Sequence, residues 1–551
     1  MWDYIVVGAG SAGCVLANRL SADPSRKVLV LEAGGPDEAL RFKVPALGSL
    51  NALGRPHSDW MLTSEPDPTR NGRQDPAFRG KVLGGSSSVN GTIYVRGNRE
   101  DYDLWAKMGC IGWDFDSLLP YFKRLECDRR GASAAHGTSG PMRISRTRGV
   151  HPLARTFIAA MGQLGIPANP DYNGEHQMGA SVPFVTQHRG WRWSAARGYL
   201  DPARRRANLA ILTNAFARRI VIEKRRAVGV ELEREGHCWV ERCSAEILVC
   251  ASVFNSPKLL MLSGIGDPEQ LRSLGIPIEC PNPSVGKNLQ EHPNVAVKCY
   301  VRARTSNMDV GLLRRALLSA RFGILGSGQA SYVFPAIAFV NLDSRSPYPE
   351  LQLHFGAFAM ESTPQGRRML DRPAVTVQAN VNRSESRGYV RLRSSDPGVP
   401  PLIQPNLLAS SRDLAALVAG IQLVRKLFRT EAFRTQFEGE FAPGHAVTTA
   451  SQLEAYVRAT AGMCYHSCGT LKMGNDDSAV VDPRLQVMGL DGLRVIDSSV
   501  IPQVPCGNIN AISMVIGEKG ADMILQDREL SRRSAGTWQL QSTTPTPNLL
   551  S

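Results

Sequence analysis

The chain has 551 residues, of which 43% are hydrophobic and 21% are charged, and its formal net charge is +14. This length exceeds what one hydrophobic core usually supports, so two or more lobes are expected. No apolar stretch approaches the roughly 18 residues that span a bilayer, and Asp3 and Tyr4 interrupt the N-terminus before the apolar core of a signal peptide could form. These features argue against an integral membrane protein and predict a cytoplasmic one.

The 11 cysteines are scattered and odd in number, which argues against a disulfide framework in so long a chain. The positive charge comes from arginine clusters such as residues 204–206, which lack interleaved aromatic residues and zinc-finger spacing. We therefore expect reduced thiols and no nucleic-acid binding. Weak attraction to anionic lipid stays open, so peripheral contact with the inner face of a membrane is an alternative.

The first motif is a strand-to-helix turn at the N-terminus. A short apolar run leads into Gly8-x-Gly10-x-x-Gly13 and then into a helical pattern of apolar residues. Gly8 permits a tight turn, Gly10 lets backbone amides approach a pyrophosphate, and Gly13 allows close helix packing. The next apolar strand ends at Glu32, where a carboxylate can accept hydrogen bonds from the ribose hydroxyls of an adenosine. Strand, glycines, helix, strand and acid in this order predict a dinucleotide site.

A second indication of a nucleotide site is the segment from Gly80 to Gly97, which has paired glycines and three consecutive serines. Its closely spaced backbone and hydroxyl donors suit a flavin or its phosphates. Serine-rich clusters are also common in turns, so a flexible loop is an equal interpretation of this segment taken alone.

Six further blocks follow the N-terminal fingerprint in order: GKVLGGSSSVNG, NSPKLLMLSGIG, VGKNLQEH, YHSCGTLKMG, VVDPRLQVMGLDGLRVIDSSVIP and GNINAISMVIGEKGADMI. In these blocks the chain resembles the glucose-methanol-choline (GMC) oxidoreductases, a family of FAD enzymes that mostly oxidise alcohols. The resemblance implies an α/β fold with an α+β second lobe. A discontinuous Rossmann-like FAD lobe is expected at residues 1–155, 205–300 and 465–527. A substrate lobe, with an antiparallel sheet covered by helices, is expected at residues 156–204 and 301–464.

Local patterns agree with this organisation. Apolar segments at residues 210–223 and 241–252 predict strands, and residues 411–429 have the periodicity of a helix. The tail at residues 528–551 is polar and ends in a Pro/Thr-rich stretch, so we expect it to be disordered.

The resemblance also implies FAD bound without a covalent link. In relatives with covalently attached FAD a histidine stands just before the asparagine of the GKVLGGSSSVNG block, and Val89 occupies that place here. The matching cofactor-binding positions are Gly8, Gly10, Ser11, Ala12, Gly13, Glu32, Ala33, Gly84, Gly85, Ser86, Val89, Asn90, Gly91, Asp497 and Asn508.

His466 lies between Cys464 and Cys468 in a C-x-H-x-C run that could indicate a metal site. On a strand, however, same-face positions are roughly 6.6 to 7 Å apart, too far for one zinc ion, and no second ligand pair is apparent. We therefore expect no metal. The resemblance places His466 at the flavin ring as general base, with Asn510 as the partner that aligns the alcohol oxygen.

The expected substrate contacts are Tyr332 and Phe334, which suggest an apolar or aromatic pocket, and His354, which matches a substrate-side histidine of some relatives. Core packing is the competing interpretation of each. Relatives that act on quaternary ammonium alcohols carry a glutamate near the position of Pro335, and residues 326–341 contain no carboxylate. A cationic substrate would lack its counter-charge, which disfavours choline.

We therefore expect FAD-dependent oxidation of a neutral aliphatic or aromatic primary alcohol to the aldehyde, with electrons passing to a quinone or another acceptor. An oxygen-using oxidase or a flavin-containing lyase of the same family is the alternative. Ser467 and Ile509 depart from the family pattern beside the expected catalytic residues. The sequence does not predict the oligomeric state.

Overall fold

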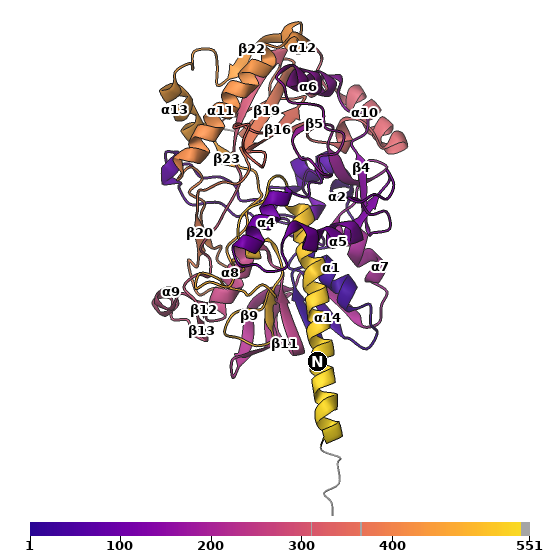
Figure 1. Ribbon diagram of the computed structural model, residues 1–551, viewed down its shortest axis with the longest axis vertical. Helices are drawn as coiled ribbons and strands as arrows, with labels where there is room; N and C mark the ends of the chain where they lie inside the picture. Colours follow the sequence, from indigo (N-terminus) through magenta and orange to yellow (C-terminus); the bar gives the residue numbers. More distant parts are fainter. Residues whose placement is uncertain (310, 364–365, 542–551) are drawn as a thin grey trace, which may run out of the picture.

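In the computed structural model the chain forms two lobes stacked along the long axis of the molecule (Figure 1). The structure describes residues 1–309, 311–363 and 366–541. Among these residues, no helix combines the length and the apolar character needed to cross a bilayer.

The lower lobe in Figure 1 contains a seven-stranded sheet. Its strands lie in the order β8 (Leu209–Leu212), β2 (Val28–Leu31), β1 (Trp2–Val7), β11 (His237–Val249), β10 (Arg226–Arg234) and β9 (Phe216–Glu223), with β24 (Leu493–Val495) also beside β11. The pairs among β8, β2, β1, β11 and β24 are parallel. The pairs β11–β10 and β10–β9 are antiparallel. The long strand β11 therefore joins a Rossmann-like parallel half to an antiparallel ribbon.

The upper lobe contains a second seven-stranded sheet, whose pairs are all antiparallel. Its strands lie in the order β22 (Phe437–Ala442), β14 (Pro293–Val301), β19 (Ala374–Val381), β16 (Leu351–Gly356), β15 (Ala336–Val340) and β5 (Gly179–Ser181), with β23 (Gly462–Met463) also beside β14. Helix α11 (Ser411–Phe428) packs on β14 and β19, and helix α6 (Pro152–Gln163) packs on β15 and β5. The predicted α/β fold with a helix-covered antiparallel second lobe is confirmed.

Smaller sheets and helices complete the fold. A four-stranded sheet has the order β3 (Glu126–Asp128), β4 (Met142–Arg146), β6 (Phe184–His188) and β7 (Trp191–Arg192). Strand pairs are formed by β12 (Ile265–Gly266) with β13 (Cys280–Pro281), β17 (Met360–Thr363) with β18 (Gly366–Met369), and β20 (Tyr389–Arg391) with β21 (Leu402–Gln404). The other helices are α1 (Ser11–Leu20), α2 (Leu40–Lys43), α3 (Pro45–Leu47), α4 (Arg99–Lys107), α5 (Phe115–Leu125), α7 (Asp201–Ala203), α8 (Ser252–Leu262), α9 (Pro268–Ser273), α10 (Leu312–Leu325), α12 (Glu431–Arg434), α13 (Ala450–Thr460) and α14 (Asn510–Gln541).

The turn between β1 and α1 depends on two glycines. Gly8 has φ +103°, and a Cβ there would lie 2.5 Å from the carbonyl oxygen of Cys250 on the neighbouring chain segment. A Cβ on Gly13 would lie 1.9 Å from the carbonyl oxygen of Gly8. Only glycine permits this approach, so these residues bring the N-terminus of α1 directly over the end of β1.

The local predictions agree with the structure at residues 210–223, which contain most of β8 and all of β9, at 241–252, which contain the end of β11, and at 411–429, where α11 lies. Two of the expected lobe boundaries cut across sheets. The boundary at residue 155 separates β4 from β6, although these two strands pair. The expected boundary at residue 300 assigned most of β14 to the FAD lobe, but β14 pairs with β19 and β22 in the second sheet. Its alternating burial fits either sheet, so the sequence pattern alone could not assign it.

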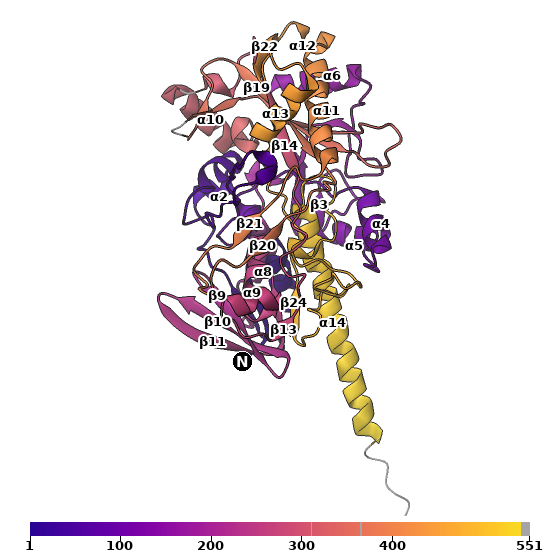
Figure 2. The same cartoon turned by 90° about the vertical axis from the view of Figure 1, so that its left-hand side faces the viewer.

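The expectation of a disordered tail from residue 528 is wrong as far as Gln541, because α14 continues to that residue (Figure 2). The segment after Asp527 is rich in Glu, Leu, Arg, Ala and Gln, which favour helix, and no proline occurs before Pro545. At the start of this segment, Arg528 bonds to the Asp3 carboxylate at 3.4 Å and to the Tyr4 hydroxyl at 3.3 Å. Residues 542–551 lie outside the described part.

Candidate active site

A cavity of about 680 Å³ is lined by residues from both large sheets. One end is formed by the β1–α1 turn and β2, and the other by β14, β16 and β19 of the upper lobe. Most of the predicted cofactor-binding residues line it: Gly8, Gly10, Ser11, Ala12, Glu32, Ala33, Gly85, Ser86, Val89, Asn90, Gly91, Asp497 and Asn508. Gly13 and Gly84 do not line it, although each shapes the backbone of a segment that does.

The end of the cavity at the β1–α1 turn has open backbone donors. Helix α1 has Gly10 as its N-cap, with no side-chain hydrogen bond to the first-turn amides. A Cβ on Gly10 would have its nearest neighbour 3.9 Å away, so there is room for a group to approach this backbone. Unpaired amides and the helix dipole together favour a phosphate at this position.

Glu32 lies beside this turn and is buried. Its two carboxylate oxygens accept hydrogen bonds from the Ala9 amide at 2.9 Å and the Gly34 amide at 2.8 Å. Burial raises the pKa of Glu32 to about 7, although these hydrogen bonds oppose the shift. A carboxylate oxygen has more than one lone pair, so the side chain can still accept hydrogen bonds from ribose hydroxyls.

At the other end of the cavity, half-buried His466 makes two polar contacts through its ring. Its Nε2 lies 2.9 Å from the Asn508 Nδ2, and its Nδ1 lies 3.0 Å from the Nδ1 of His292. The Asn508 Oδ1 accepts a hydrogen bond from Gln352 at 3.2 Å, which leaves the Asn508 NH₂ to donate to His466. The His466 Nε2 is therefore an acceptor and the ring proton is on Nδ1. This Nδ1–H donates to the Nδ1 of His292.

Burial holds the pKa of His466 well below its usual value, and His292, His354 and Arg79 lower it further. Burial also lowers the pKa of His292 to about 3. Both imidazoles are therefore neutral at physiological pH. The His466 Nε2 is thus unprotonated, as a general base requires, and in this structure its lone pair accepts from the Asn508 amide.

Sequence matches and structural relatives identify the family of the chain. The N-terminal family model of the GMC oxidoreductases matches residues 2–294, and the C-terminal one matches residues 384–517. The chain belongs to the GMC oxidoreductase family. GMC relatives among curated proteins include the oxygen-dependent choline dehydrogenases of Sinorhizobium fredii, 42% identical over 97% of this chain and 98% of that protein, and of Brucella canis, 39% identical over 97% and 98%.

Solved GMC structures superimpose closely on the chain. Pyridoxine 4-oxidase from Mesorbium loti has a TM-score of 0.87 and 29% identity, covering 95% of this chain and 99% of that one. Formate oxidase from Aspergillus oryzae RIB40 has a TM-score of 0.87 and 27% identity, covering 96% and 98%. As a GMC oxidoreductase, the protein is an FAD-dependent enzyme that oxidises an alcohol-type substrate.

The residues present fit the GMC cofactor. The open N-terminus of α1 can hold the pyrophosphate, and Glu32 can hold the adenosine ribose. At the other end, nothing lies within 4 Å of a Cβ added to Gly91, so a flat ring can approach this backbone. Val89 is 2% exposed, packs with Phe42 and Val82, and has no nucleophilic atom for a covalent bond. FAD is therefore held by non-covalent contacts.

This assignment predicts that acid precipitation releases all of the flavin. The supernatant should contain free FAD, measured by absorbance and chromatography, and the protein pellet should be colourless. Flavin that stays with the pellet would contradict the assignment and would require a different attachment residue.

Asn510 was expected to be the partner of His466, and the structure corrects that expectation. Asn510 begins α14, and its Oδ1 accepts a hydrogen bond from the Ser11 hydroxyl at 2.7 Å. Asn508, two residues earlier in the same GNINAIS block and expected only as a cofactor contact, makes the contact with His466. Asn510 therefore links α14 to the first turn of α1 and does not contact the base.

Glu291 and His292 are site residues that the sequence analysis did not single out, although they lie in the VGKNLQEH block. The Glu291 carboxylate accepts hydrogen bonds from the His466 amide at 2.7 Å and from the Ser467 hydroxyl at 2.6 Å. Ser467, which replaces the usual proline of the family, thus helps to hold the base in place. Burial raises the pKa of Glu291, opposed by Ser467 and by the nearby Arg79 guanidinium.

The C-x-H-x-C run does not gather ligands. The Cys464 sulfur accepts from the Gln378 amide at 3.7 Å, and Cys468 is fully buried. Burial raises the pKa of both thiols, so both stay protonated. Within residues 1–309, 311–363 and 366–541, no group of three or more His, Cys, Asp or Glu side chains is arranged so that it could hold a metal ion.

Of the expected substrate contacts, Phe334 and His354 line the cavity and Tyr332 does not. Tyr332 is 8% exposed and is therefore buried away from the cavity. The rings of Phe334 and His354 lie 5.1 Å apart, and the His354 Nδ1 lies 3.0 Å from the Asn380 Nδ2. Phe358, which was not predicted, also lines this part of the cavity.

Four acidic side chains line the described cavity, and each has partners within the protein. Glu32 bonds to backbone amides, and Asp497 bonds to serines 252, 256 and 499. Asp75 pairs with Arg70 at 2.6 Å and with Arg73 at 3.0 Å, and Glu361 pairs with Arg368. Among the described residues, the carboxylates at the substrate end, those of Asp75 and Glu361, are therefore each paired with an arginine.

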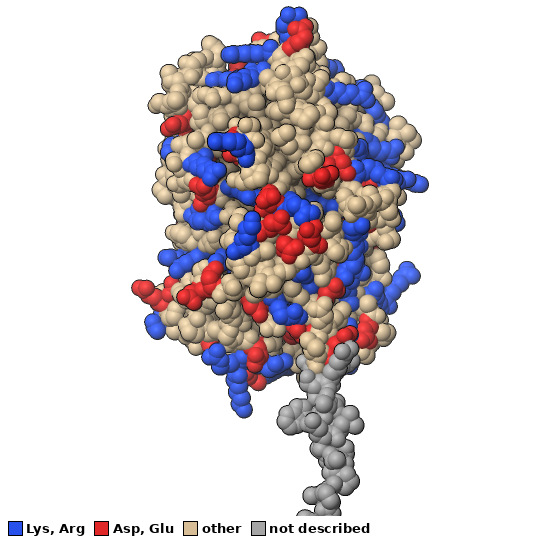
Figure 3. Space-filling view, in the orientation of Figure 1, with Lys and Arg blue, Asp and Glu red and all other residues tan. Residues whose placement is uncertain are grey.

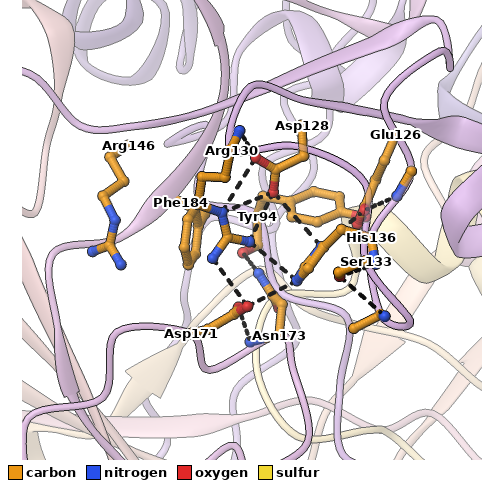
Figure 4. Close-up of polar contacts among 12 residues, drawn as sticks. Tyr94, Glu126, Asp128, Arg130, Ser133, His136, Arg146, Asp171, Asn173 and Phe184 are labelled. Atoms are coloured by element: carbon orange, nitrogen blue, oxygen red, sulfur yellow. Dashed lines mark hydrogen bonds and ion pairs between the residues drawn. The ribbon is translucent and has the colours of Figure 1, made fainter.

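A buried charge cluster lies beside the segment that follows Asn90 and Gly91 (Figure 4). Glu126 is at its centre. It accepts hydrogen bonds from the Tyr94 hydroxyl at 2.5 Å and the Arg96 Nε at 2.7 Å, and it lies 3.1 Å from the His136 Nδ1. The His136 Nε2 lies 2.9 Å from the Asp171 carboxylate. Through these contacts, the cluster joins Tyr94 and Arg96, which follow the expected flavin-binding residues in the chain, to Glu126 of β3.

Proposed function

We propose that this enzyme oxidises a neutral primary alcohol to the corresponding aldehyde, with His466 as the general base. The observation that carries the proposal is the neutral, acceptor-type Nε2 of His466, which lies 2.9 Å from Asn508 in the cavity. Bound FAD supplies the acceptor for the hydride that leaves the alcohol carbon.

His466 and Asn508 divide the work at the substrate oxygen. The alcohol hydroxyl replaces the Asn508 amide at the His466 Nε2, which takes the hydroxyl proton. The Asn508 amide then donates to the alcohol oxygen and keeps it in line. Glu291 accepts a hydrogen bond from the His466 backbone amide, and His292 accepts one from the His466 Nδ1–H. The orientation of the His466 ring is therefore fixed before the substrate binds. Product formation leaves the proton on His466, which must release it before the next turnover.

The lining of the cavity supports a neutral substrate. Phe334 and Phe358 are apolar, and the carboxylates that face the cavity are already paired. A quaternary ammonium group would be transferred from water without an unpaired counter-charge, which is costly. The curated relatives are named choline dehydrogenases, but the lining of this cavity does not favour choline as the substrate of this enzyme.

The matched test compares choline with 3,3-dimethyl-1-butanol, which has the same shape without the charge. At equal concentration under anaerobic conditions, the neutral alcohol should reduce the flavin at least about tenfold faster. Loss of oxidised-flavin absorbance measures the rate. Choline reduction at the same rate or faster would contradict the proposed substrate class.

For the electron acceptor we favour a quinone or another small acceptor over oxygen. Admitting air to the alcohol-reduced enzyme, in parallel with adding a soluble quinone, tests this choice. The quinone should reoxidise the reduced flavin much faster than oxygen does. Equally rapid reoxidation by air would identify an oxidase. No flavin reduction by any alcohol of a broad panel would favour a lyase.

A further inference from the structure

Helix α10 (Leu312–Leu325, LLRRALLSARFGIL) has an unusually exposed apolar surface. Among its described residues, only Phe322 is buried. Five of the large apolar side chains that are exposed in the described protein belong to this one helix, with exposed fractions of 86% for Leu312, 77% for Leu313, 56% for Leu317, 82% for Ile324 and 55% for Leu325. Scattered exposed apolar residues are normal, but a concentration of this kind marks an interaction site.

The exposed residues follow the helical repeat. Leu313, Leu317, Ala320 and Ile324 are spaced at i, i+4, i+7 and i+11, which places them on one face. Phe322 lies on the opposite face and anchors the helix, with its ring centroid 4.7 Å from that of Trp191. The apolar stripe therefore points away from the protein, while a separate contact holds the helix in place.

A basic cleft lies next to the C-terminal end of this stripe. It is lined by Ile324 and Leu325 of α10 and by four arginines, Arg129, Arg148, Arg189 and Arg197, and its described lining contains no Asp or Glu. The pKa of His188 in the same cleft is lowered by burial and by the surrounding arginines. A positive cleft without counter-charge suits an anionic group such as a phosphate.

The helix itself is also basic. It carries Arg314, Arg315 and Arg321 and no acidic residue. Figure 3 shows blue side chains along the right-hand edge of the upper lobe, where Figure 1 places α10. Apolar side chains on one face with arginines around them are the pattern of a helix that lies in the plane of a membrane interface.

We propose that the α10 stripe and the adjacent arginine cleft form a docking surface for a bilayer of anionic phospholipids. The large side chains of the stripe, those of Leu313, Leu317 and Ile324, enter the boundary between the lipid headgroups and the acyl chains. The arginines of the cleft bind lipid phosphates. A neutral partner protein would match the stripe but would leave the cleft without a counter-charge, so the charge complementarity favours the lipid surface.

Docking would place the substrate end of the cavity near the bilayer. Only residues 326–328 separate α10 from the short helix η6 (Gln329–Ser331), and Val333 and Phe334 just beyond it line the cavity. Apolar alcohols and quinones concentrate in bilayers. The docking itself rests on the surface alone and does not depend on which alcohol is oxidised.

The test is co-sedimentation of the full-length holoenzyme with vesicles of phosphatidylcholine containing about a third phosphatidylglycerol, compared with vesicles of phosphatidylcholine alone. The apolar variant is Leu317→Asn with Ile324→Asn, and its matched control is Ile111→Asn with Met488→Asn, two exposed apolar residues on other segments. The charge variant is Arg129→Gln with Arg148→Gln, and its control is Arg219→Gln with Arg242→Gln on strands β9 and β11.

Wild-type protein and both controls should bind the anionic vesicles, and the apolar variant should bind at least about tenfold more weakly. The charge variant should lose about tenfold or more, because each arginine near an anionic surface contributes roughly a fivefold factor. Flavin content and alcohol oxidation with a soluble dye should stay unchanged in all variants, which shows that they fold.

Three results would overturn the proposal. The first is a wild-type protein that binds neither vesicle. The second is binding that survives both the apolar and the charge variants, because the lipid would then bind elsewhere. The third is a wild-type dimer in solution that the apolar variant converts to a monomer, because the stripe would then be an interface between two copies of this chain.

Discussion

Replacing His466 with alanine should slow flavin reduction by alcohol by about 10²- to 10⁴-fold, the usual contribution of a positioned proton acceptor. FAD should stay bound, because the open α1 turn and Glu32 lie at the other end of the cavity. Anaerobic stopped-flow measurement gives the rate, and the flavin-to-protein absorbance ratio gives the occupancy. A variant that is reduced at the wild-type rate would remove His466 from the reaction.

Two asparagine variants make this test specific to the observed geometry. Asn508→Ala should also slow flavin reduction, by about 10- to 100-fold, since the donor to the substrate oxygen is lost. Asn510→Ala removes only the link to Ser11, so it should weaken FAD binding with little effect on the reduction rate of the loaded enzyme. The opposite pattern would restore Asn510 as the partner of the base.

The pH dependence follows from the same geometry. Burial and the neighbouring His292 hold the pKa of His466 well below its usual value, so the unprotonated form predominates at neutral pH. The reduction rate at saturating alcohol should therefore stay level as pH falls from 8 through about 6.5, the ordinary pKa of histidine, and should decline only in more acidic buffer. A decline centred near pH 6.5, the ordinary pKa of histidine, would show that the pKa of His466 is not lowered in the complex with the alcohol.

What the sequence predicted well depends on residues close together in the chain. The turn glycines Gly8 and Gly13, and Glu32 at the end of the following strand, act within one β-α-β unit, so their spacing determines their geometry. The family blocks extend this to His466, which lines the cavity, whereas Phe334 lies outside these blocks and was expected only from its aromatic side chain. The expected helix at residues 411–429 has the same origin, because its periodicity is local.

The errors concern contacts between distant segments. Asn508 and Asn510 differ by two positions, and only the start of α14 at Asn510 shows which of them faces His466. Glu291 reaches the amide of His466 because β14 and the residues before it lie beside the segment around residue 466. No periodicity in one sequence encodes such a pairing, which is why Glu291 and His292 were missed.

The largest stability effect is expected in the buried charge cluster. Glu126→Leu should lower the free energy of unfolding by about 3 to 5 kcal/mol, because Arg96 would remain buried without its partner. Glu126 has no side-chain exposure and Arg96 has 1%, so water cannot replace the lost contacts. Denaturant titration followed by flavin fluorescence and circular dichroism measures the change.

The matched control is Asp116→Asn, which removes the partner of Arg99 in a pair with side-chain exposures of 73% and 48%. That exposed pair should contribute less than about 1 kcal/mol. Equal losses from Glu126→Leu and Asp116→Asn would mean that the burial of the cluster does not determine its contribution.

The cluster should also make stability depend on pH through His136. Burial lowers the pKa of His136, but its hydrogen bonds to Asp171 and Glu126 outweigh burial and raise it above the usual value. Protonated His136 joins Arg96 and Arg130 opposite three carboxylates, those of Glu126, Asp128 and Asp171. The folded pKa exceeds the unfolded one, so the stabilisation is complete below about pH 6.5 and is lost as pH rises through the folded value.

His136→Gln, which keeps a polar side chain without the charge, should therefore destabilise the protein most in acidic buffer and least in alkaline buffer. The difference in unfolding free energy between wild type and variant, measured from about pH 5 to pH 9, should shrink as pH rises. A difference that is constant over this range would mean that His136 acts only through packing and neutral hydrogen bonds. A difference that grows with pH would mean that His136 is neutral in the fold and that the three carboxylates are balanced by the two arginines and by hydrogen bonds alone.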